Sequence, residues 1–294
     1  MSFKVIGIGE VLWDLLPAGP QLGGAPANFV YHARALGAQA GVVTRVGRDA
    51  LGQDIQRRLA AMRLPADLVQ VDEAAPTGTV TVELTGEGVP NFTIHEDVAW
   101  DHLQLTDASL AAAHAADALC FGSLAQRAEP SRGTIQQLLR QSPPVALRIF
   151  DINLRQHFHS RRVIETSLQL ANVIKLNDGE LPVLATLFEL MGNSQMQVAA
   201  LAQRFDLRLV ALTLGPQGSL LYQGGRWSKC GTQPVQVADT VGAGDAFTAA
   251  LAMGLLRQMD LDAINFAANE VARQVCSCAG ATPSLPDSVR KLFT

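Results

Sequence analysis

Two aspartates flank a loop of small residues in the last quarter of the chain. Asp239 and Asp245 lie six residues apart, with Gly242, Ala243 and Gly244 between them, and a helical pattern follows. Small residues allow successive backbone N–H groups at a helix start to converge on an anion. The segment therefore predicts a phosphate or oxyanion cradle. A helix-capping aspartate at a glycine turn would explain Asp245 alone, but it leaves Asp239 and the bulk-free loop unexplained.

A second polar cluster lies near the N-terminus. Asp14 follows an apolar run, and Gly23-Gly24-Ala25-Pro26-Ala27-Asn28 comes shortly after it. Open α/β sheets bind ligands at the carboxyl ends of their strands, and Pro26 is typical of the first turn of a helix. We expect Asn28 to lie beside Asp14, where the two side chains would bind vicinal hydroxyls. A plain loop-to-helix junction would also account for the glycines.

Short apolar runs alternate with helical patterns along most of the chain. The runs that indicate buried strands are Val5–Trp13, Val42–Val46, Ala118–Phe121, Val145–Phe150, Val173–Leu176 and Leu209–Leu214. Helical patterns cover 25–36, 51–62, 131–139, 163–171, 195–205, 243–256 and 261–279. This alternation predicts an α/β fold with a doubly wound, mostly parallel sheet flanked by helices, in a single domain over residues 1–294.

One segment departs from this pattern. From Thr79 to Thr85 apolar and polar residues alternate strictly, and the alternation resumes over Asn91–His95 after a hairpin-like connection at 86–90. A period of two is typical of a half-exposed strand. The pattern predicts a small β-sheet lid, with strands inserted from about 10–20 and 77–98. A surface β-flap without function is the alternative.

Composition excludes several classes of protein. Of the 294 residues 48% are hydrophobic and 17% charged, which suits a compact globule rather than a disordered chain. The net charge of −4, without a run of Lys or Arg, argues against a nucleic-acid partner. Neither a signal peptide nor a membrane span is indicated, so we expect a soluble, cytoplasmic protein. No complete dinucleotide-binding fingerprint or P-loop occurs.

Taken together, three segments resemble the signature regions of the ribokinase-like sugar kinases, the phosphofructokinase B family. They are Asp239-Thr240-Val241-Gly242-Ala243-Gly244-Asp245, Gly23-Gly24-Ala25-Pro26-Ala27-Asn28 and Val46-Gly47-Arg48-Asp49-Ala50-Leu51-Gly52. The resemblance covers essentially the whole chain. Within the family, Gly-Gly-Ala-Pro followed by Asn is most similar to the bacterial fructokinases.

The resemblance implies roles for the residues that carry it. Asp245 would be the catalytic base that takes the proton of the attacking sugar hydroxyl, while the amides from Gly242 through Ala243 and Gly244 hold the phosphoryl oxygens. Arg155, in Asp151-x-Asn153-x-Arg155, would lie near phosphates or substrate, although a solvated strand end is the alternative. The implied sugar-binding residues are Asp14, Gly23, Gly24, Asn28, Arg155 and Asp245.

ATP and Mg²⁺ are the implied co-substrate and cofactor. Asn177-Asp178-Gly179-Glu180 matches the family's N-x-x-E element, in which Glu180 would organise Mg²⁺ through water; a helix capping box is the alternative. The residues implied to contact ATP are Asn177, Thr213, Gly215, Gly218, Gly244 and Asn269. A monovalent cation, K⁺, is a further hypothesis, with Asp239, the Val241 carbonyl and Ser284 as its ligands.

The resulting interpretation is an ATP-dependent kinase that phosphorylates a primary hydroxyl of a small sugar, with fructose as the first choice and its 6-hydroxyl as the acceptor. Ribose, 2-keto-3-deoxygluconate or a nucleoside are alternative acceptors, and a catalytically silent sugar-binding regulator is the non-enzymatic alternative. Many fructokinases carry an Arg after the second lid strand, where this chain has Ile94-His95-Glu96. This departure weighs against an acidic or phosphorylated substrate. A homodimer joined through the lid strands is a further expectation.

Overall fold

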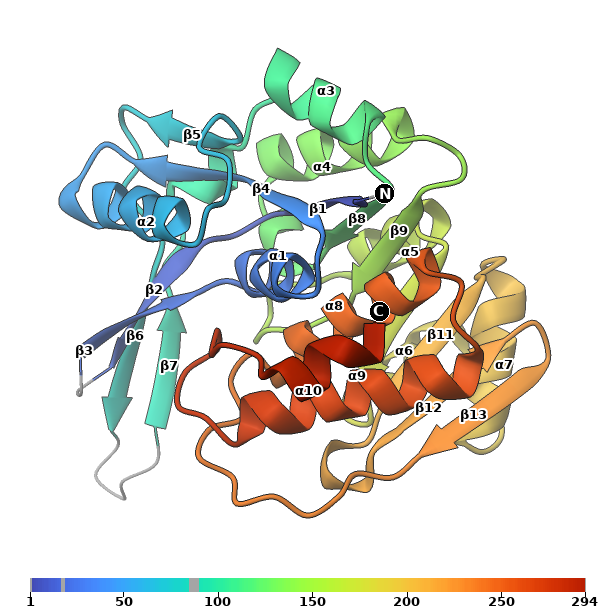
Figure 1. Cartoon of the computed structure of the whole chain (residues 1–294). Helices are drawn as coiled ribbons and strands as arrows, with labels where there is room; N and C mark the ends of the chain where they lie inside the picture. The colour runs from blue at the N-terminus through green and yellow to red at the C-terminus, as the bar shows by residue number, and fades with distance from the viewer. Residues whose placement is uncertain (1, 17–18, 85–89, 294) are drawn as a thin grey trace.

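Seven neighbouring strands of a nine-stranded sheet run parallel to one another. We describe the computed structural model over residues 2–16, 19–84 and 90–293 (Figure 1). The parallel strands are β1 (Lys4–Ile8), β4 (Gln39–Gly47), β5 (Val69–Asp72), β8 (Ala118–Phe121), β9 (Leu147–Asp151), β10 (Val173–Asn177) and β11 (Leu209–Thr213). The antiparallel hairpin β12 (Ser219–Gln223) and β13 (Arg226–Cys230) extends the sheet beyond β11. The order is β13-β12-β11-β10-β9-β8-β1-β4-β5, which confirms the predicted mostly parallel sheet.

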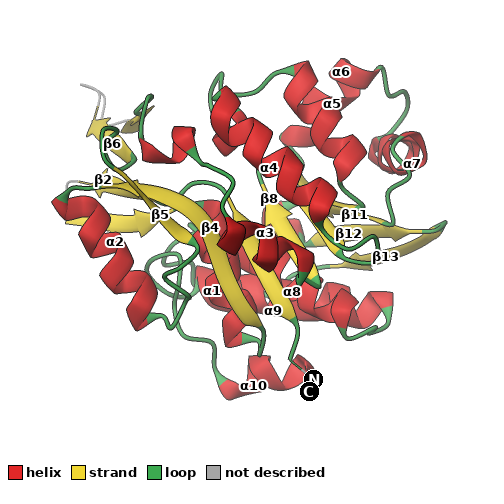
Figure 2. Ribbon diagram, turned by 90° about the horizontal axis from the view of Figure 1, so that it is seen from above, coloured by secondary structure: helices red, strands yellow, loops and turns green. Residues whose placement is uncertain are grey.

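Helices cover both faces of this sheet, as predicted (Figure 2). One face packs against α1 (Ala25–Ala35), α2 (Ala50–Ala61), α8 (Ala243–Leu256) and α9 (Leu261–Cys276). The other packs against α3 (Asp107–His114), α4 (Glu129–Gln141), α5 (Arg161–Leu170), α6 (Glu180–Phe188) and α7 (Ser194–Arg204). Short helical segments lie at η1 (Ala99–His102), η2 (Leu124–Gln126), η3 (Gly215–Gln217), α10 (Asp287–Arg290) and η4 (Lys291–Phe293).

The strands are apolar on both sides because each face is covered. Adjacent residues of β1 and β4 belong to different cores: Val5 and Val42 pack against the α8 side, whereas Ile6 and Val43 pack against the α4 side. Side chains alternate across a strand, so a continuous apolar run is what a doubly covered strand requires. Helix α8 is buried from Ala246 to Leu255 between α1, α9 and the sheet, and this fixes the position of its N-terminus.

A separate four-stranded sheet projects from the edge of the main domain (Figure 1). Its strands are β2 (Leu12–Leu16), β3 (Gly19–Gly23), β6 (Thr79–Leu84) and β7 (Pro90–Ile94), in the order β3-β2-β6-β7. Val80 and Ile94 are buried on one face, as a half-exposed sheet predicts. The connection predicted at residues 86–90 lies, at 86–89, outside the described residues. We refer to this sheet as the lid.

The single strand predicted over Val5–Trp13 is wrong. The chain leaves the main sheet after Ile8 and enters the lid at Leu12, and Gly9 between them has a φ of 144°. The apolar residues resume soon after the break because Val11, Leu12 and Trp13 are themselves buried. Within the described ranges, no helix combines the length and the apolar character needed to cross a membrane.

Candidate active site

The predicted anion cradle lies at the N-terminus of α8. Gly242 is the N-cap residue with a φ of 77°, and a Cβ there would approach the Ala281 carbonyl oxygen to 2.5 Å. Only glycine fits such a left-handed and crowded position. The buried His32 ring nitrogen Nε2 contacts the same Ala281 oxygen at 2.9 Å. The first amides of α8 are therefore held in a fixed direction, as an anion-binding helix N-terminus requires.

Asp245 lies in the first turn of α8 and is hydrogen-bonded from across the site. The Asn28 amide nitrogen donates to Asp245 Oδ2 at 2.8 Å. Burial raises the pKa of Asp245 to about 6, and the Asp151 carboxylate contributes in the same direction, while Asn28, Lys175 and Arg155 oppose it. A carboxylate with this pKa is ionised at neutral pH and has enough proton affinity to act as a general base. Asn28 contacts Asp245, rather than Asp14 as expected from the sequence.

A buried ion pair that the sequence analysis missed lies beneath the cradle. Lys175 Nζ is 3.1 Å from Asp151 Oδ1, and the Thr248 hydroxyl donates to Asp151 Oδ2 at 2.8 Å. A Cβ on Gly244 would lie 3.1 Å from the same Nζ, so the ammonium approaches the loop where glycine leaves room. Burial lowers the pKa of Lys175, but the carboxylates of Asp151, Glu180 and Asp245 outweigh it and leave the pKa raised. The cradle thus has a permanent positive charge beside it.

Glu10 is a second buried carboxyl that the sequence analysis did not identify. It follows β1 and is 3% exposed, and its Oε2 has no hydrogen-bond partner. Burial raises its pKa to about 7; the Asp245 charge adds to this, whereas the backbone amides of Glu10 and Ala25 and the Arg155 charge counter it. Asp245 therefore has a neighbouring carboxyl that exchanges its own proton near neutral pH.

Contacts and charge interactions link several of the residues predicted to hold a sugar. Asp14 packs so closely over Gly23 that a Cβ there would clash with Asp14 Oδ2, and Gly24 caps α1, the helix that carries Asn28. Burial raises the pKa of Asp14, and the Arg155 guanidinium opposes this. Since Arg155 acts in the same way on Asp245, its charge lies close to both carboxylates. Carboxylates, an amide and a guanidinium are groups that suit the hydroxyls of a small polar ligand.

Asn177 and Glu180 form the capping arrangement that was the alternative interpretation of their spacing. Asn177 Oδ1 accepts from the amides of Gly179 and Glu180, and Glu180 Oε2 accepts from the Asn177 amide. Glu180 Oε1 accepts from the Leu154 amide at 2.9 Å. Each carboxylate oxygen still has a free lone pair, and Mg²⁺ in kinases commonly retains waters and few protein ligands. The site therefore fits a Glu180 that holds Mg²⁺ through water, alongside its capping role.

The implied ATP contacts occupy the next strand ends. Thr213 ends β11 directly beside Asn177 of β10, and Gly215 and Gly218 bound the η3 turn that follows. Asn269 differs from expectation: it is 4% exposed, and its amide nitrogen donates to Ser219 and Asn265. The Asn269 side chain therefore ties α9 to the β12–β13 hairpin.

The residues predicted for a monovalent cation are only partly joined. Asp239 accepts from the Val241 amide at 3.0 Å and from the Gly280 amide at 3.1 Å, which fixes the entry to the cradle. Ser284 is exposed and lines a separate surface cavity together with Tyr31 and Arg34 of α1. The structure thus joins Asp239 to Val241, and it assigns Ser284 to a different surface.

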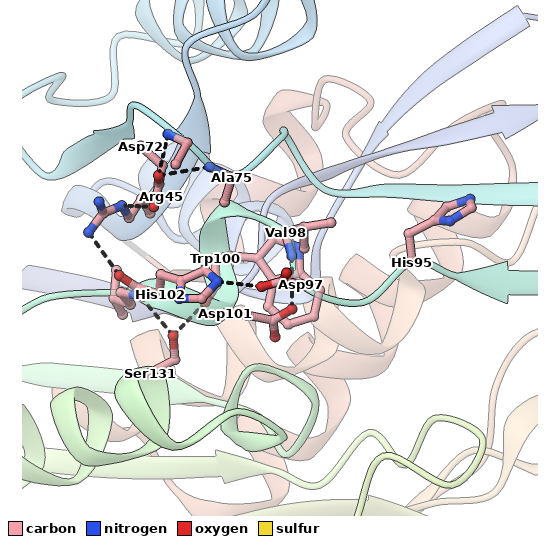
Figure 3. Close-up of polar contacts among 12 residues, drawn as sticks. Arg45, Asp72, Ala75, His95, Asp97, Val98, Trp100, Asp101, His102 and Ser131 are labelled. Atoms are coloured by element: carbon pink, nitrogen blue, oxygen red, sulfur yellow. Dashed lines mark hydrogen bonds and ion pairs between the residues drawn. The ribbon is translucent and has the colours of Figure 1, made fainter.

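A polar network in the segment that follows the lid ties residues 97–102 to the main domain (Figure 3). His102 contacts Asp97 at 2.8 Å, and its carbonyl accepts from Arg45, which is itself paired with Asp72. Arg127 pairs with Asp101, donates to the His95 carbonyl and stacks on Trp100. The Arg127 guanidinium is thus bound by groups of the protein itself.

Comparison with known proteins identifies the family. The model of the pfkB family of carbohydrate kinases matches residues 20–288. A fructokinase from Klebsiella pneumoniae is 32% identical over 269 residues, which cover 87% of this chain and 85% of the relative. A fructokinase from Escherichia coli is likewise 32% identical, with 87% and 85% covered.

Solved structures of related kinases share the whole architecture. A sugar kinase from Pyrococcus horikoshii in complex with ATP superposes with a TM-score of 0.80 at 28% identity, covering 98% of this chain and 99% of that one. Fructokinase from Vibrio cholerae, with fructose, ADP and calcium bound, gives a TM-score of 0.79 at 26% identity, covering 100% and 99%. The fold, the cradle and the family match agree: the chain belongs to the PfkB family and is an ATP-dependent carbohydrate kinase.

Proposed function

We propose that this kinase transfers the γ-phosphoryl group of ATP to the 6-hydroxyl of fructose, with Asp245 as the base. The observation that supports this most is the placement of Asp245. Its carboxylate is held by Asn28 at the N-terminus of α8, has a pKa of about 6, and has the Lys175 ammonium on the other side of the loop. A base, an anion cradle and a fixed cation are what phosphoryl transfer to an alcohol requires.

The proposed step begins at the acceptor hydroxyl. Asp245 removes the proton of the sugar hydroxyl, and the hydroxyl oxygen forms a bond to the γ-phosphorus. The bond from that phosphorus to the bridging oxygen breaks, and ADP leaves with the electron pair. The amides from Gly242 to Asp245, with Lys175, stabilise the charge on the phosphoryl oxygens. Little covalent chemistry is asked of the protein, because positioning and electrostatics supply the rate.

The nucleotide would lie over the ends of β10 and β11, with Asn177, Thr213, Gly215 and Gly218 along it. Mg²⁺, held through water by Glu180, would supply charge neutralisation on the phosphates. We also propose K⁺ at Asp239 and the Val241 carbonyl, without Ser284. Activity should fall when K⁺ is replaced by tetramethylammonium; unchanged activity would exclude this cation.

Fructose is proposed as the acceptor on two grounds. The relatives from Klebsiella pneumoniae and Escherichia coli are fructokinases. In addition, Asp14, Asn28 and Asp245 offer hydrogen-bond partners to the hydroxyls of a sugar. Ribose, 2-keto-3-deoxygluconate and nucleosides are the competing acceptors.

The experiment is an ADP-release assay with ATP and Mg²⁺ over fructose, ribose, glucose, tagatose, 2-keto-3-deoxygluconate and adenosine. The highest kcat/KM on fructose, with fructose 6-phosphate as the product in phosphorus NMR, would support the proposal. A higher kcat/KM on another acceptor would replace the substrate and leave the mechanism intact. Sugar binding without turnover of any acceptor would instead favour a silent sugar-binding protein.

A further inference from the structure

The loop after β9 is held in an unusual backbone conformation. Asn153 and Gln156 have φ values of 44° and 46°, in the left-handed region, which non-glycine residues adopt rarely and only when their surroundings enforce it. The enforcing contacts lie on both sides of Arg155. The Leu154 amide donates to Glu180 at 2.9 Å, and the Phe158 amide donates to the Arg155 carbonyl at 3.0 Å.

The Arg155 side chain extends from this loop and is held by few side-chain contacts. The side chain is exposed, and its guanidinium donates to the neighbouring Leu154 carbonyl at 3.2 Å. Nevertheless its charge reaches the carboxyls of Glu10, Asp14 and Asp245, whose proton affinities it lowers. The direction of Arg155 is therefore set mainly by the backbone of the loop rather than by side-chain partners.

Gln156 connects this loop to the lid. Its side-chain amide donates to the Phe92 carbonyl of β7 at 2.5 Å. Phe92 precedes Ile94 by two residues, and Ile94, Val80 and Asp14 occupy paired positions across β7, β6 and β2. Residues two apart on a strand share a face, as do residues paired across strands. The Gln156 bond thus joins the Arg155 loop to strand β7 of the lid, and Asp14 of β2 lies on the same face of the lid as Phe92.

We propose that Gln156 is a positioning residue that locks the lid to the Arg155 loop, so that Arg155 and the lid hold the sugar together. The consequence is specific to the acceptor: weakening the lock should loosen the sugar and leave the ATP contacts on β10 and β11 in place. The sugar-binding part of this inference rests on the proposed function, whereas the lock itself does not.

The test compares Gln156→Met, which cannot donate, with Gln156→Lys, which can. Both keep a long side chain at the same left-handed backbone position, so their difference reports the donor together with the positive charge that Lys adds. We expect Gln156→Met to raise the sugar KM by about 2- to 12-fold, the range of one neutral hydrogen bond, with the KM for ATP unchanged, and Gln156→Lys to restore it. Gln137→Met, at an exposed position of α4, is the matched control. Equal sugar KM values in the wild type and Gln156→Met, or no rescue by Lys, would overturn the proposal.

A double-mutant cycle tests whether Gln156 acts through Arg155. In the Arg155→Met background, the Gln156→Met substitution should raise the sugar KM by a smaller factor, because one of the two groups that the lock holds together is gone. The same KM ratio in both backgrounds would contradict the proposal.

Hydrogen exchange of the ligand-free protein tests the contact between Gln156 and the lid without reference to any substrate. The amides of β7 should exchange about 2- to 12-fold faster in Gln156→Met than in the wild type, again the range of one hydrogen bond. Unchanged exchange would refute the lock even if the enzyme proves to be a fructokinase. Faster exchange in a protein that phosphorylates no sugar would leave the lock standing and remove the proposed function.

Discussion

Replacing Glu10 with glutamine should change how stability depends on pH. Because Glu10 is buried, its pKa rises from 4.5 to about 7, so the folded state binds this proton more tightly than the unfolded chain does. A raised carboxyl pKa means that stability is lost as pH rises from about 4.5 to about 7. A pKa change of this size corresponds to about 3 kcal/mol once both states are ionised. The Glu10→Gln substitution removes that dependence while keeping the shape of the side chain.

The assay is urea unfolding of the wild type and Glu10→Gln at pH 5 and pH 8. We compare the free energy of unfolding of the variant minus that of the wild type at the two pH values. This difference should be about 2 to 3 kcal/mol larger at pH 8 than at pH 5. The absolute difference at either pH also includes the new amide donors, so the change between the two pH values is the decisive quantity. Two pH profiles that run parallel would refute the reasoning about this carboxyl.

Other consequences of the site can be tested in the same preparation. Since Asp245 must be ionised to act as a base and has a pKa of about 6, kcat/KM should fall about tenfold for each pH unit below 6; a profile that stays flat to pH 5 would contradict this. Lys175→Met leaves Asp151 buried without its partner and should cost about 3 to 5 kcal/mol of stability. Adding Asp151→Asn should recover much of that stability but not the activity. Recovered activity would show that the Lys175 ammonium is not needed. The homodimer expected through the lid predicts sedimentation as a dimer, and a monomer at working concentration would rule it out.

A structural feature could be predicted from the sequence where the residues that form it are neighbours in the chain. The run from Gly242 to Asp245 builds a cradle within one turn because small residues and a following helix are enough to define it. The alternation beginning at Thr79 predicted the lid because a half-exposed strand has a period of two.

Contacts between distant segments could not be predicted in this way. Asn28 and Asp245 are 217 residues apart, and only the packing of α1 against α8 brings them together. Lys175 lies within an apolar strand and is buried in an ion pair with Asp151. A single charged residue in such a strand was a signal of a buried ion pair, because a buried lysine is almost always paired. Asn269 shows the opposite error: its place along α9 matched the family pattern, but the side chain faces the sheet rather than a ligand surface.

The most direct test of the central claim is phosphoryl transfer by Asp245→Asn. This variant keeps the size of the side chain and the contact with Asn28, but it cannot take up a proton at neutral pH. In the ADP-release assay with the best sugar acceptor, kcat should fall by about 10² to 10⁴, the contribution of a general base, while circular dichroism and the unfolding midpoint show a folded protein. A folded variant that retains most of its activity would contradict the assignment of Asp245 as the base.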